Sequence, residues 1–117
     1  MIVDSQFGWA SVGDKKFSKD IIIHVDRQVT ERRTELSKVY MNDFFHVPLS
    51  ENELGFLAEE KPEVVIIGAG FKGMMLLTPK AKETLKDYEH MVLTTPAALD
   101  KINKEGRRYV AIIHVTC

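Results

Sequence analysis

The sequence predicts one three-layer α/β domain over residues 1–117: a mixed, mostly parallel central sheet, flanking helices and a small N-terminal β-hairpin layer. The first observation is three apolar runs at residues 21–25, 64–67 and 109–115, which lack polar alternation as strands buried on both faces do. The second is that helix-start signals separate the apolar runs of the second half. Its strand, helix, strand, helix, strand order with short connections favours parallel crossovers.

The composition bounds the class of protein. A chain of 117 residues is one domain, and a net charge of -1 argues against a nucleic-acid-binding module. The single cysteine, Cys117, allows no internal disulfide and fits a reducing compartment. No signal peptide is visible and no apolar run reaches the roughly 20 residues of a membrane span, so we expect a cytoplasmic protein without membrane contact. Three Asn and two Gln against 17 Asp plus Glu hint at a heat-adapted source.

The N-terminal layer is predicted from a turn signal. Residues 9–12 and 15–18 flank Gly13 and Asp14, and Gly at the first turn position suits a two-residue type II′ hairpin. Alternation places Phe7 and Trp9 on one face, which we expect to cover the core.

Three helices follow from their capping residues. Ser50 as N-cap with Glu53 three residues later forms a capping box, and this helix ends at Pro62. Thr78 before Pro79 begins a second helix, and Thr95 before Pro96 begins a third that stops at Gly106. The stretch 27–42 carries no strong cap and is predicted to be mostly loop.

The principal candidate site follows residues 64–67. The glycines Gly68, Gly70 and Gly73 have the spacing G-x-G-x-x-G and turn the chain at the carboxyl end of the strand, where α/β sheets bind ligands. Thr94 and Thr95 should end the next strand at the same edge. We therefore hypothesise a ligand- or partner-binding site formed by a short set of residues: Gly68, Gly70, Phe71, Lys72, Thr94 and Thr95.

Three interpretations of this glycine loop stay open. Backbone N–H groups could cradle a phosphate or another small anion. A dinucleotide fits less well, because the next helix starts late, at Thr78, and no acidic residue ends the following strand. The loop could also be a tight turn that lets strand and helix pack closely.

A set of motifs resembles the MTH-domain family, a domain of unknown function. After the hairpin, the motifs are Ile66-Ile67-Gly68-x-Gly70, a proline-started helix, Thr94-Thr95-x-Ala97-Ala98, Asn103, Gly106-Arg107-Arg108-x-Val110-Ala111 and His114-Val115-Thr116-Cys117. Relatives include an adipogenesis-associated cytosolic protein and a mitochondrial complex I assembly factor. The resemblance implies a three-layer α/β fold with a mixed sheet and no agreed activity or cofactor.

Other candidate residues carry less weight. His114-x-x-Cys117 has metal-ligand residue types but lacks the four ligands of a zinc site, so we predict no metal and no cofactor. His24 lies among apolar residues and is interpreted as a hydrogen-bonded strand histidine. Five arginines, which we expect on a solvated face, could otherwise form a basic patch: Arg27, Arg32, Arg33, Arg107 and Arg108.

These observations favour a non-catalytic module that binds a protein partner or assists assembly. No coherent set of catalytic residues occurs, and the relatives' roles in assembly point the same way. Phe56, Phe71, Met74 and Met75 would mark a contact surface if they are not core. The alternative is a small-ligand or anion-binding protein, or an enzyme, that uses the loop at residues 68–73. The oligomeric state stays open.

Overall fold

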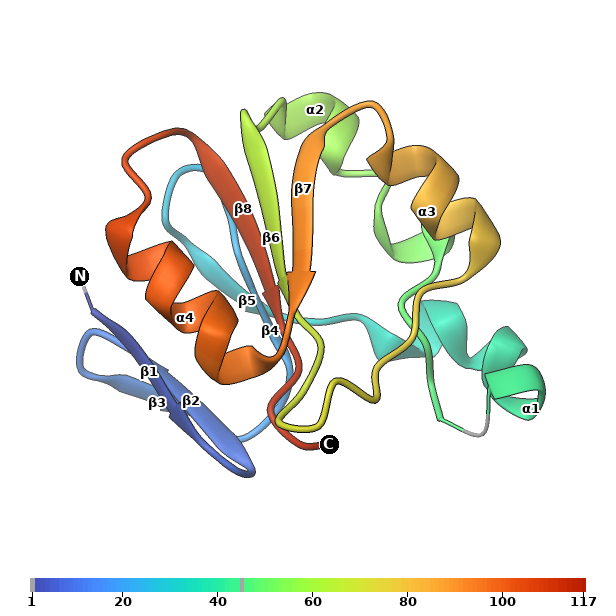
Figure 1. The fold of residues 1–117 in the computed structure, drawn as a ribbon, viewed down its shortest axis with the longest axis horizontal. Coiled ribbons are helices and arrows are strands. Elements are labelled where there is room, and N and C mark those ends of the chain that lie inside the picture. The colour runs from blue at the N-terminus through green and yellow to red at the C-terminus, as the bar shows by residue number, and fades with distance from the viewer. Residues whose placement is uncertain (1, 45) are drawn as a thin grey trace.

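The computed structural model describes residues 2–44 and 46–117, and it has the α/β character that the sequence predicts (Figure 1). Its larger sheet has five strands in the order β5-β4-β8-β6-β7. These strands are β4 (Ile21–Ile23), β5 (Val29–Glu31), β6 (Val64–Gly68), β7 (Glu89–Leu93) and β8 (Tyr109–Ile113).

The sheet is mixed. β6 pairs in parallel with both β7 and β8, whereas β4 pairs antiparallel with both β5 and β8. Parallel pairing therefore does not dominate, which corrects the mostly parallel sheet that the sequence predicts. The reason is local: β4 and β5 are joined by a tight hairpin, which can only make an antiparallel pair.

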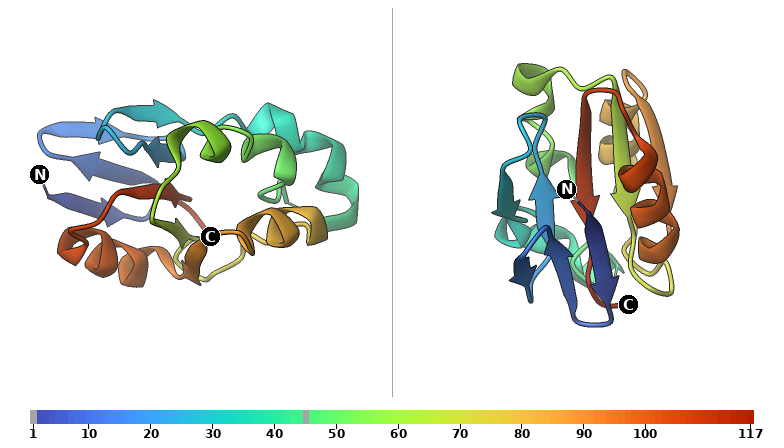
Figure 2. Two further views of the ribbon diagram at one scale, coloured as in Figure 1. Left: turned by 90° about the horizontal axis from the view of Figure 1, so that it is seen from above. Right: turned by 90° about the vertical axis from the view of Figure 1, so that its left-hand side faces the viewer.

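Both faces of the larger sheet are covered, so its central strands are buried on both sides. On one face, Val64 and Ile66 pack with α4 (Thr95–Lys104) and with the N-terminal sheet. On the other face, Val65 and Ile67 pack with α3 (Pro79–Leu85), α2 (Leu57–Glu60) and the 3₁₀ helix η2 (Glu51–Glu53). Figures 1 and 2 show these elements on opposite sides of the sheet.

The N-terminal layer is a three-stranded antiparallel sheet, β1-β2-β3, one strand larger than predicted. Its strands are β1 (Val3–Gln6), β2 (Trp9–Val12) and β3 (Lys15–Phe17). The two-residue turn at Gly13 and Asp14 is confirmed, with Gly13 at φ +60°. The predicted inward face is wrong: Phe7 is exposed in the first turn, and Ala10 and Val12 cover the core instead.

The α3 and α4 helices begin close to where the sequence places them. Thr78 caps α3, and its hydroxyl accepts a hydrogen bond from the Ala81 N–H at 3.1 Å. The predicted cap of α4 is off by one residue: Thr94 is the N-cap, whereas Thr95 lies inside the first turn and is fully buried.

The predicted helix after Ser50 is broken into η2 and α2. Ser50 does cap, but its hydroxyl accepts from the Asn52 N–H rather than from Glu53. Glu53 turns inward to Arg32, so the capping box does not form. The stretch 27–42 is also more regular than predicted: it holds β5, the 3₁₀ helix η1 (Thr34–Tyr40) and the start of α1 (Met41–Phe44). No helix of the described residues could cross a membrane.

Candidate functional site

The six residues of the predicted site lie together at the carboxyl edge of β6. The Gly70 N–H donates to Thr95 Oγ1 at 3.0 Å, and the Thr95 N–H donates to the Gly70 carbonyl oxygen at 3.0 Å. A Cβ on Gly68 would lie 3.0 Å from Thr95 Oγ1. These three residues are buried and form a tight packing contact between the loop and α4.

The backbone donors of the loop already have partners inside the protein. The N–H groups of Phe71, Lys72 and Met74 donate to the carbonyl oxygens of Thr116 and Cys117 at 2.8 to 3.0 Å. The remaining N–H groups from residue 69 to 75 also donate to backbone or threonine oxygens. The loop thus presents no open set of donors of the kind that cradles a phosphate.

The glycines serve close packing against the end of the chain described here. Gly70 has φ +100°, and a Cβ there would lie 2.1 Å from the Cys117 carbonyl carbon. Phe71 packs against Phe7 with ring centroids 5.9 Å apart, and the Lys72 side chain is exposed. This arrangement matches the third interpretation of the loop, a turn that allows close contact between segments.

A small cavity of about 250 Å³ lies beside this loop. His114, Thr116 and Cys117 line it together with Asp20 and Met75. His114 Nδ1 lies 2.8 Å from Asp20 Oδ2, and its Nε2 lies 3.2 Å from Thr116 Oγ1. His114 thus belongs to a polar network with Asp20 and Thr116, and Cys117 lines the same cavity.

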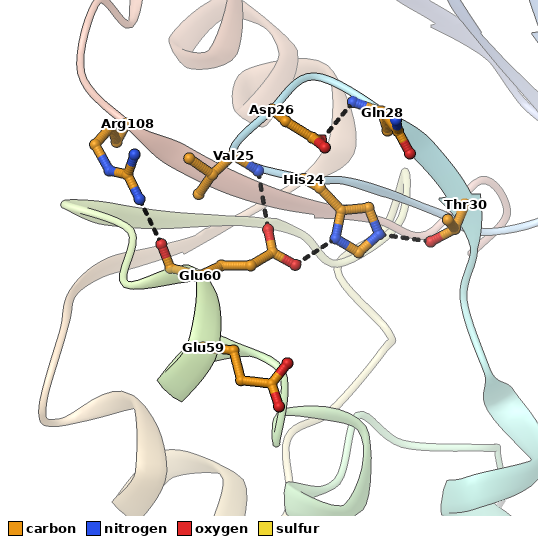
Figure 3. Close-up of a pocket in the computed structure, with 8 residues that line it drawn as sticks. All are labelled: His24, Val25, Asp26, Gln28, Thr30, Glu59, Glu60 and Arg108. Atoms are coloured by element: carbon orange, nitrogen blue, oxygen red, sulfur yellow. Dashed lines mark hydrogen bonds and ion pairs between the residues drawn. The ribbon is translucent and has the colours of Figure 1, made fainter.

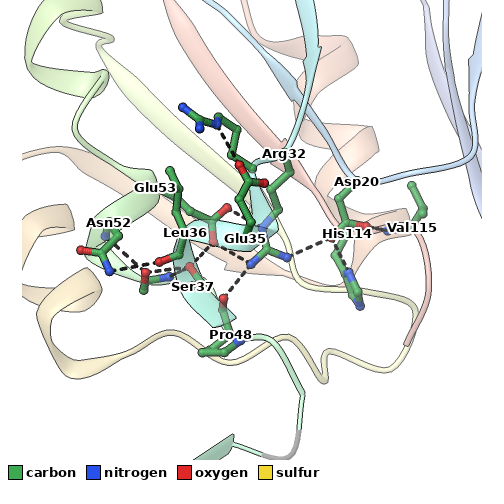
Figure 4. A network of polar contacts seen from close by, with 12 residues as sticks. Asp20, Arg32, Glu35, Leu36, Ser37, Pro48, Asn52, Glu53, His114 and Val115 are labelled. Carbon is green, nitrogen blue, oxygen red and sulfur yellow. Dashed lines mark hydrogen bonds and ion pairs between the residues drawn. The ribbon is translucent and has the colours of Figure 1, made fainter. Parts of the chain in front are cut away.

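That network continues into the protein through a buried arginine (Figure 4). The Arg32 guanidinium donates from Nε and Nη2 to the two Glu53 carboxylate oxygens at 2.7 and 2.8 Å. Its Nη1 donates to Asp20 Oδ2 at 3.0 Å, and Nη2 also donates to the Pro48 carbonyl oxygen at 2.6 Å. The side chains of Arg32 and Glu53 are each 1% exposed.

The charges in the network stabilise one another. Burial alone would raise the pKa of the Asp20 carboxyl. The hydrogen bond with His114, the charge of His114, the hydrogen bond from the Val115 N–H and the charge of Arg32 together lower this pKa. Burial would likewise lower the pKa of Arg32, but the hydrogen bond and charge of Glu53, followed by Asp20, raise it. Among the described residues, no buried side-chain N or O atom lacks a partner. We interpret this network as structural.

A different site lies at the opposite edge of the sheet, where β4 ends (Figure 3). His24 Nδ1 lies 2.6 Å from Glu60 Oε2, and His24 Nε2 lies 2.7 Å from Thr30 Oγ1. The Val25 N–H donates to the second Glu60 oxygen at 3.0 Å. The hydrogen-bonded histidine is confirmed, but its partners could not be read from the sequence because they lie on α2 and β5.

A third feature is an apolar groove of about 620 Å³ beside β7, here called the β7 groove. Leu76 and Val92 line it and are 51% and 43% exposed. Met75, predicted as contact surface if not core, is 2% exposed and forms part of the floor. Lys82 of α3 and Lys86, the C-cap of that helix, also line the groove, and both are exposed.

Across the described residues, no group of three or more His, Cys, Asp or Glu side chains is placed to hold a metal ion.

Several solved structures share the fold of this chain over most of their length. The conserved hypothetical protein PH1505 from Pyrococcus horikoshii OT3 has a TM-score of 0.87 and 29% identity, with 100% of both chains covered. The protein MT938 has a TM-score of 0.80 and 36% identity, covering 99% of this chain and 98% of the other. A Bordetella pertussis protein described as a Mth938-like domain has a TM-score of 0.59 and 21% identity over 97% and 85% of the chains, and so shows the fold alone.

Comparison by sequence points to the same group. No protein with a curated description matches the chain. A family model described as "Protein of unknown function (DUF498/DUF598)" matches residues 2–114. With MT938 as a full-length relative of the same fold, the resemblance noted in the sequence is confirmed. The chain belongs to the DUF498/DUF598 family of Mth938-like proteins, whose function is unknown.

Proposed function

We propose that the protein binds an extended, partly acidic segment of a partner protein, and that this segment adds a strand to β7 within the β7 groove. The observation that carries the proposal is the position of this groove, which lies beside a strand that ends the sheet. The function proposed for this groove is that of a binding module for a partner protein.

The backbone of β7 offers the first half of the interface. Within the described residues β7 pairs with β6 only, because it is the last strand in the sheet order. An edge strand presents unpaired N–H and C=O groups, and an incoming peptide satisfies them by β-augmentation. Because the Leu93 carbonyl oxygen accepts from the Ala69 N–H on the β6 side, the outward-facing backbone groups of β7 are by alternation those of His90 and Val92.

The side chains of the groove offer the second half. Leu76 and Val92 are large, apolar and about half exposed, and they lie in the same groove. Met74, 43% exposed, precedes this stretch in the chain. Burying such side chains against a partner contributes about 25 cal/mol for each Å² removed from water. The partner segment therefore needs apolar side chains on the face turned to the groove.

Charge selects the partner further. Lys82 and Lys86 line the groove, and Lys86 forms an exposed ion pair with Glu83 at 3.2 Å. An exposed ion pair of this kind is worth little and is easily exchanged. Acidic residues in the partner would face these lysines, speed association and set its orientation.

The six residues predicted from the sequence take a supporting role in this proposal. Gly68, Gly70 and Thr95 fix the bend after β6, and this bend directs residues 73–77 to the groove. Phe71 and Lys72 lie within the bend and Thr94 lies opposite it, outside the residues that line the groove.

The test uses a displayed library of random peptides selected on the wild-type protein. We expect enrichment of sequences that combine apolar and acidic residues. A synthetic consensus peptide should then protect the amides of His90 and Val92 from hydrogen exchange, because these N–H groups face away from β6 and gain strand partners. Peptides without such a pattern, or protection elsewhere in the chain, would contradict the proposal.

Matched variants sharpen this test. Leu76→Glu and Val92→Glu each place a charge in the groove and should weaken the consensus peptide by about tenfold or more. Val39→Glu is the control, since Val39 is 75% exposed and lies on η1 outside the groove. Equal loss in all three variants would speak for unspecific binding.

The alternative, an anion held by the loop at residues 68–73, makes a separate prediction. Since the loop N–H groups are occupied, inorganic phosphate or ADP should not raise the melting temperature beyond an equal ionic strength of sodium chloride. A ligand at about 100 times its Kd would stabilise by about 2.7 kcal/mol. A saturable rise with phosphate would restore the anion hypothesis.

A further inference from the structure

Two contacts of His24 connect a carboxylate, an imidazole and a hydroxyl group. Its Nδ1 lies 2.6 Å from Glu60 Oε2, and its Nε2 lies 2.7 Å from Thr30 Oγ1 (Figure 3). An ionised carboxylate only accepts hydrogen bonds, so the proton of a neutral imidazole lies on Nδ1. Nε2 is then an acceptor and the Thr30 hydroxyl donates to it. A base that is oriented by a third group and touches a hydroxyl is the arrangement that activates a nucleophile.

His24 and Glu60 are held in place by contacts with their neighbours, yet they and Thr30 remain accessible to solvent. The Val25 N–H fixes the Glu60 carboxylate from its other oxygen at 3.0 Å. The Phe56 ring packs edge-on against the imidazole, with centroids 5.4 Å apart. The side chains of His24 and Glu60 remain 19% and 24% exposed, and Thr30 is exposed on the edge strand β5. A small molecule can therefore reach the hydroxyl and the imidazole.

Two cavities meet at this pair of residues and differ in chemistry. Both are lined by His24 and Thr30. The first, of about 410 Å³, is lined by Ile22, Leu36 and Phe56, which suit an apolar group. Its other lining residues include a polar set: Glu31, Arg33, Asn52 and Glu53. The second, of about 480 Å³, continues over a polar set of residues: Asp26, Gln28, Glu59, Glu60 and Arg108. A substrate that spans both has an apolar part, a reactive centre above Thr30 and a polar part.

We propose that Thr30, His24 and Glu60 form a hydrolytic site for small carboxylic esters with an apolar acyl group and a polar alcohol. Thr30 Oγ1 bonds to the carbonyl carbon while its proton passes to His24 Nε2. The ester C–O bond breaks, the alcohol leaves with that proton, and an acyl-threonine remains. Water then attacks the acyl group, losing a proton to Nε2, and the carboxylic acid departs as Thr30 recovers its hydroxyl. Glu60 is a positioning residue that orients the imidazole.

The first experiment uses two probes on the whole chain. Diisopropyl fluorophosphate should modify Thr30, as read by peptide mass spectrometry, and p-nitrophenyl butyrate should release p-nitrophenolate. Thr30→Val should abolish both signals, whereas Thr30→Ser should keep them because the hydroxyl is retained. A folded wild-type protein that shows neither signal at Thr30 overturns the proposal.

The second experiment tests the base with a matched pair of histidine variants. His24→Asn should slow modification of Thr30 by about 100-fold, the usual size of general-base catalysis. His46→Asn is the control, since His46 is exposed and lines neither of the two cavities. Thermal unfolding shows whether each variant folds. Equal rates in folded His24→Asn and wild type overturn the proposal.

The third experiment tests whether Glu60 positions the His24 imidazole or only stabilises the fold. Imidazole ¹⁵N chemical shifts report the tautomer of His24 without any substrate. The wild type should show the Nδ1–H form, and Glu60→Gln should shift the ring toward the other tautomer while slowing the modification of Thr30. If Glu60→Gln changes the melting temperature but neither the tautomer nor the rate, Glu60 has only a structural role and the proposed site is wrong.

Discussion

At the scale of single residues, two neighbouring arginines lie in opposite environments. Arg32 is buried and donates to Glu53, Asp20 and Pro48, whereas Arg33 is exposed and pairs only with Glu35 at 2.9 Å. The alternation of β5 continues past its end, so one guanidinium points into the protein and the next into water. The sequence pattern predicts a solvated face for both, and for Arg32 this is wrong.

The two arginines should differ strongly in their contribution to stability. Arg32→Ala leaves the Glu53 and Asp20 carboxylates without their counter-ion, which costs about 3–5 kcal/mol of unfolding free energy when a buried pair is broken. Arg33→Ala should change it by less than about 0.5 kcal/mol. Urea denaturation of both variants measures the difference, and similar losses would contradict the structural role of the network.

Two glycines provide a second matched pair. Gly70→Ala should cost about 3 kcal/mol or more, because φ is +100° and the new Cβ would lie 2.1 Å from the Cys117 carbonyl carbon. Gly106→Ala meets nothing within 4 Å and should change stability by less than about 0.5 kcal/mol. Thermal unfolding compares them. A mild effect at Gly70 would mean that the loop and residues 114–117 can separate at little cost.

At the scale of elements, the two threonine-capped helices differ in what their caps do. The Thr78 hydroxyl accepts from the Ala81 N–H and donates to Glu51 Oε1 at 2.9 Å. Thr94 makes no hydrogen bond with its side chain at the N-terminus of α4. The buried neighbour Thr95 instead donates to the His114 carbonyl oxygen at 2.7 Å and accepts from Gly70. The Thr-Pro signal thus marks both helix starts but not the residue that makes the contacts.

This difference yields a prediction for the caps. Thr78→Ala should lower the unfolding free energy by about 1–2 kcal/mol, the size of a lost N-cap. Thr94→Ala should lower it by less than about 0.5 kcal/mol, since no cap hydrogen bond is lost. Chemical denaturation of the two variants against wild type provides the comparison. The idea fails if Thr94→Ala proves as costly as Thr78→Ala.

The remaining element, the broken helix after Ser50, shows how tertiary contacts override a local signal. Glu53 has the spacing of a capping box, yet its carboxylate binds the Arg32 guanidinium through two hydrogen bonds. A charge-assisted bidentate pair is stronger than a single contact with a backbone N–H. The chain therefore forms η2 and α2, two short helices in place of one longer one.

At the scale of the whole molecule, the Arg32 network ties distant parts of the chain together. Asp20 and His114 are 94 residues apart in sequence and 2.8 Å apart in space. Asp20 lies before β4 and His114 lies after β8. Their contact therefore joins these two segments at the carboxyl end of β8, next to the glycine loop. Acid should therefore loosen this contact.

The pH dependence follows from the direction of one pKa. Despite burial, which raises it, the pKa of Asp20 is lowered in the folded protein by His114, Val115 and Arg32. Its contribution to stability is complete above the ordinary Asp value of about 4 and is lost as pH falls through the lower folded pKa. The melting-temperature gap between wild type and Asp20→Asn should thus narrow as the pH falls below the ordinary Asp value of about 4. Asp14→Asn, at an exposed position of the hairpin turn, is the matched control.

The sequence by itself determined the class of fold, the hairpin turn at Gly13, the buried strand β6 and the two helices that start at Thr-Pro. These features depend on neighbours within a few residues, where apolar runs, glycines and prolines restrict the backbone directly. The sequence also located the bend at residues 68–73. Its resemblance to the MTH-domain family implied no agreed activity.

Only the tertiary structure decided which polar groups meet. The loop N–H groups turn to the carbonyl oxygens of Thr116 and Cys117, Glu53 turns to Arg32, and His24 joins Glu60, which lies 36 residues away. The physical reason is that a hydrogen bond depends on a few tenths of an ångström between atoms that strand order and helix packing bring together. Residue spacing along the chain carries no such information for partners on different elements.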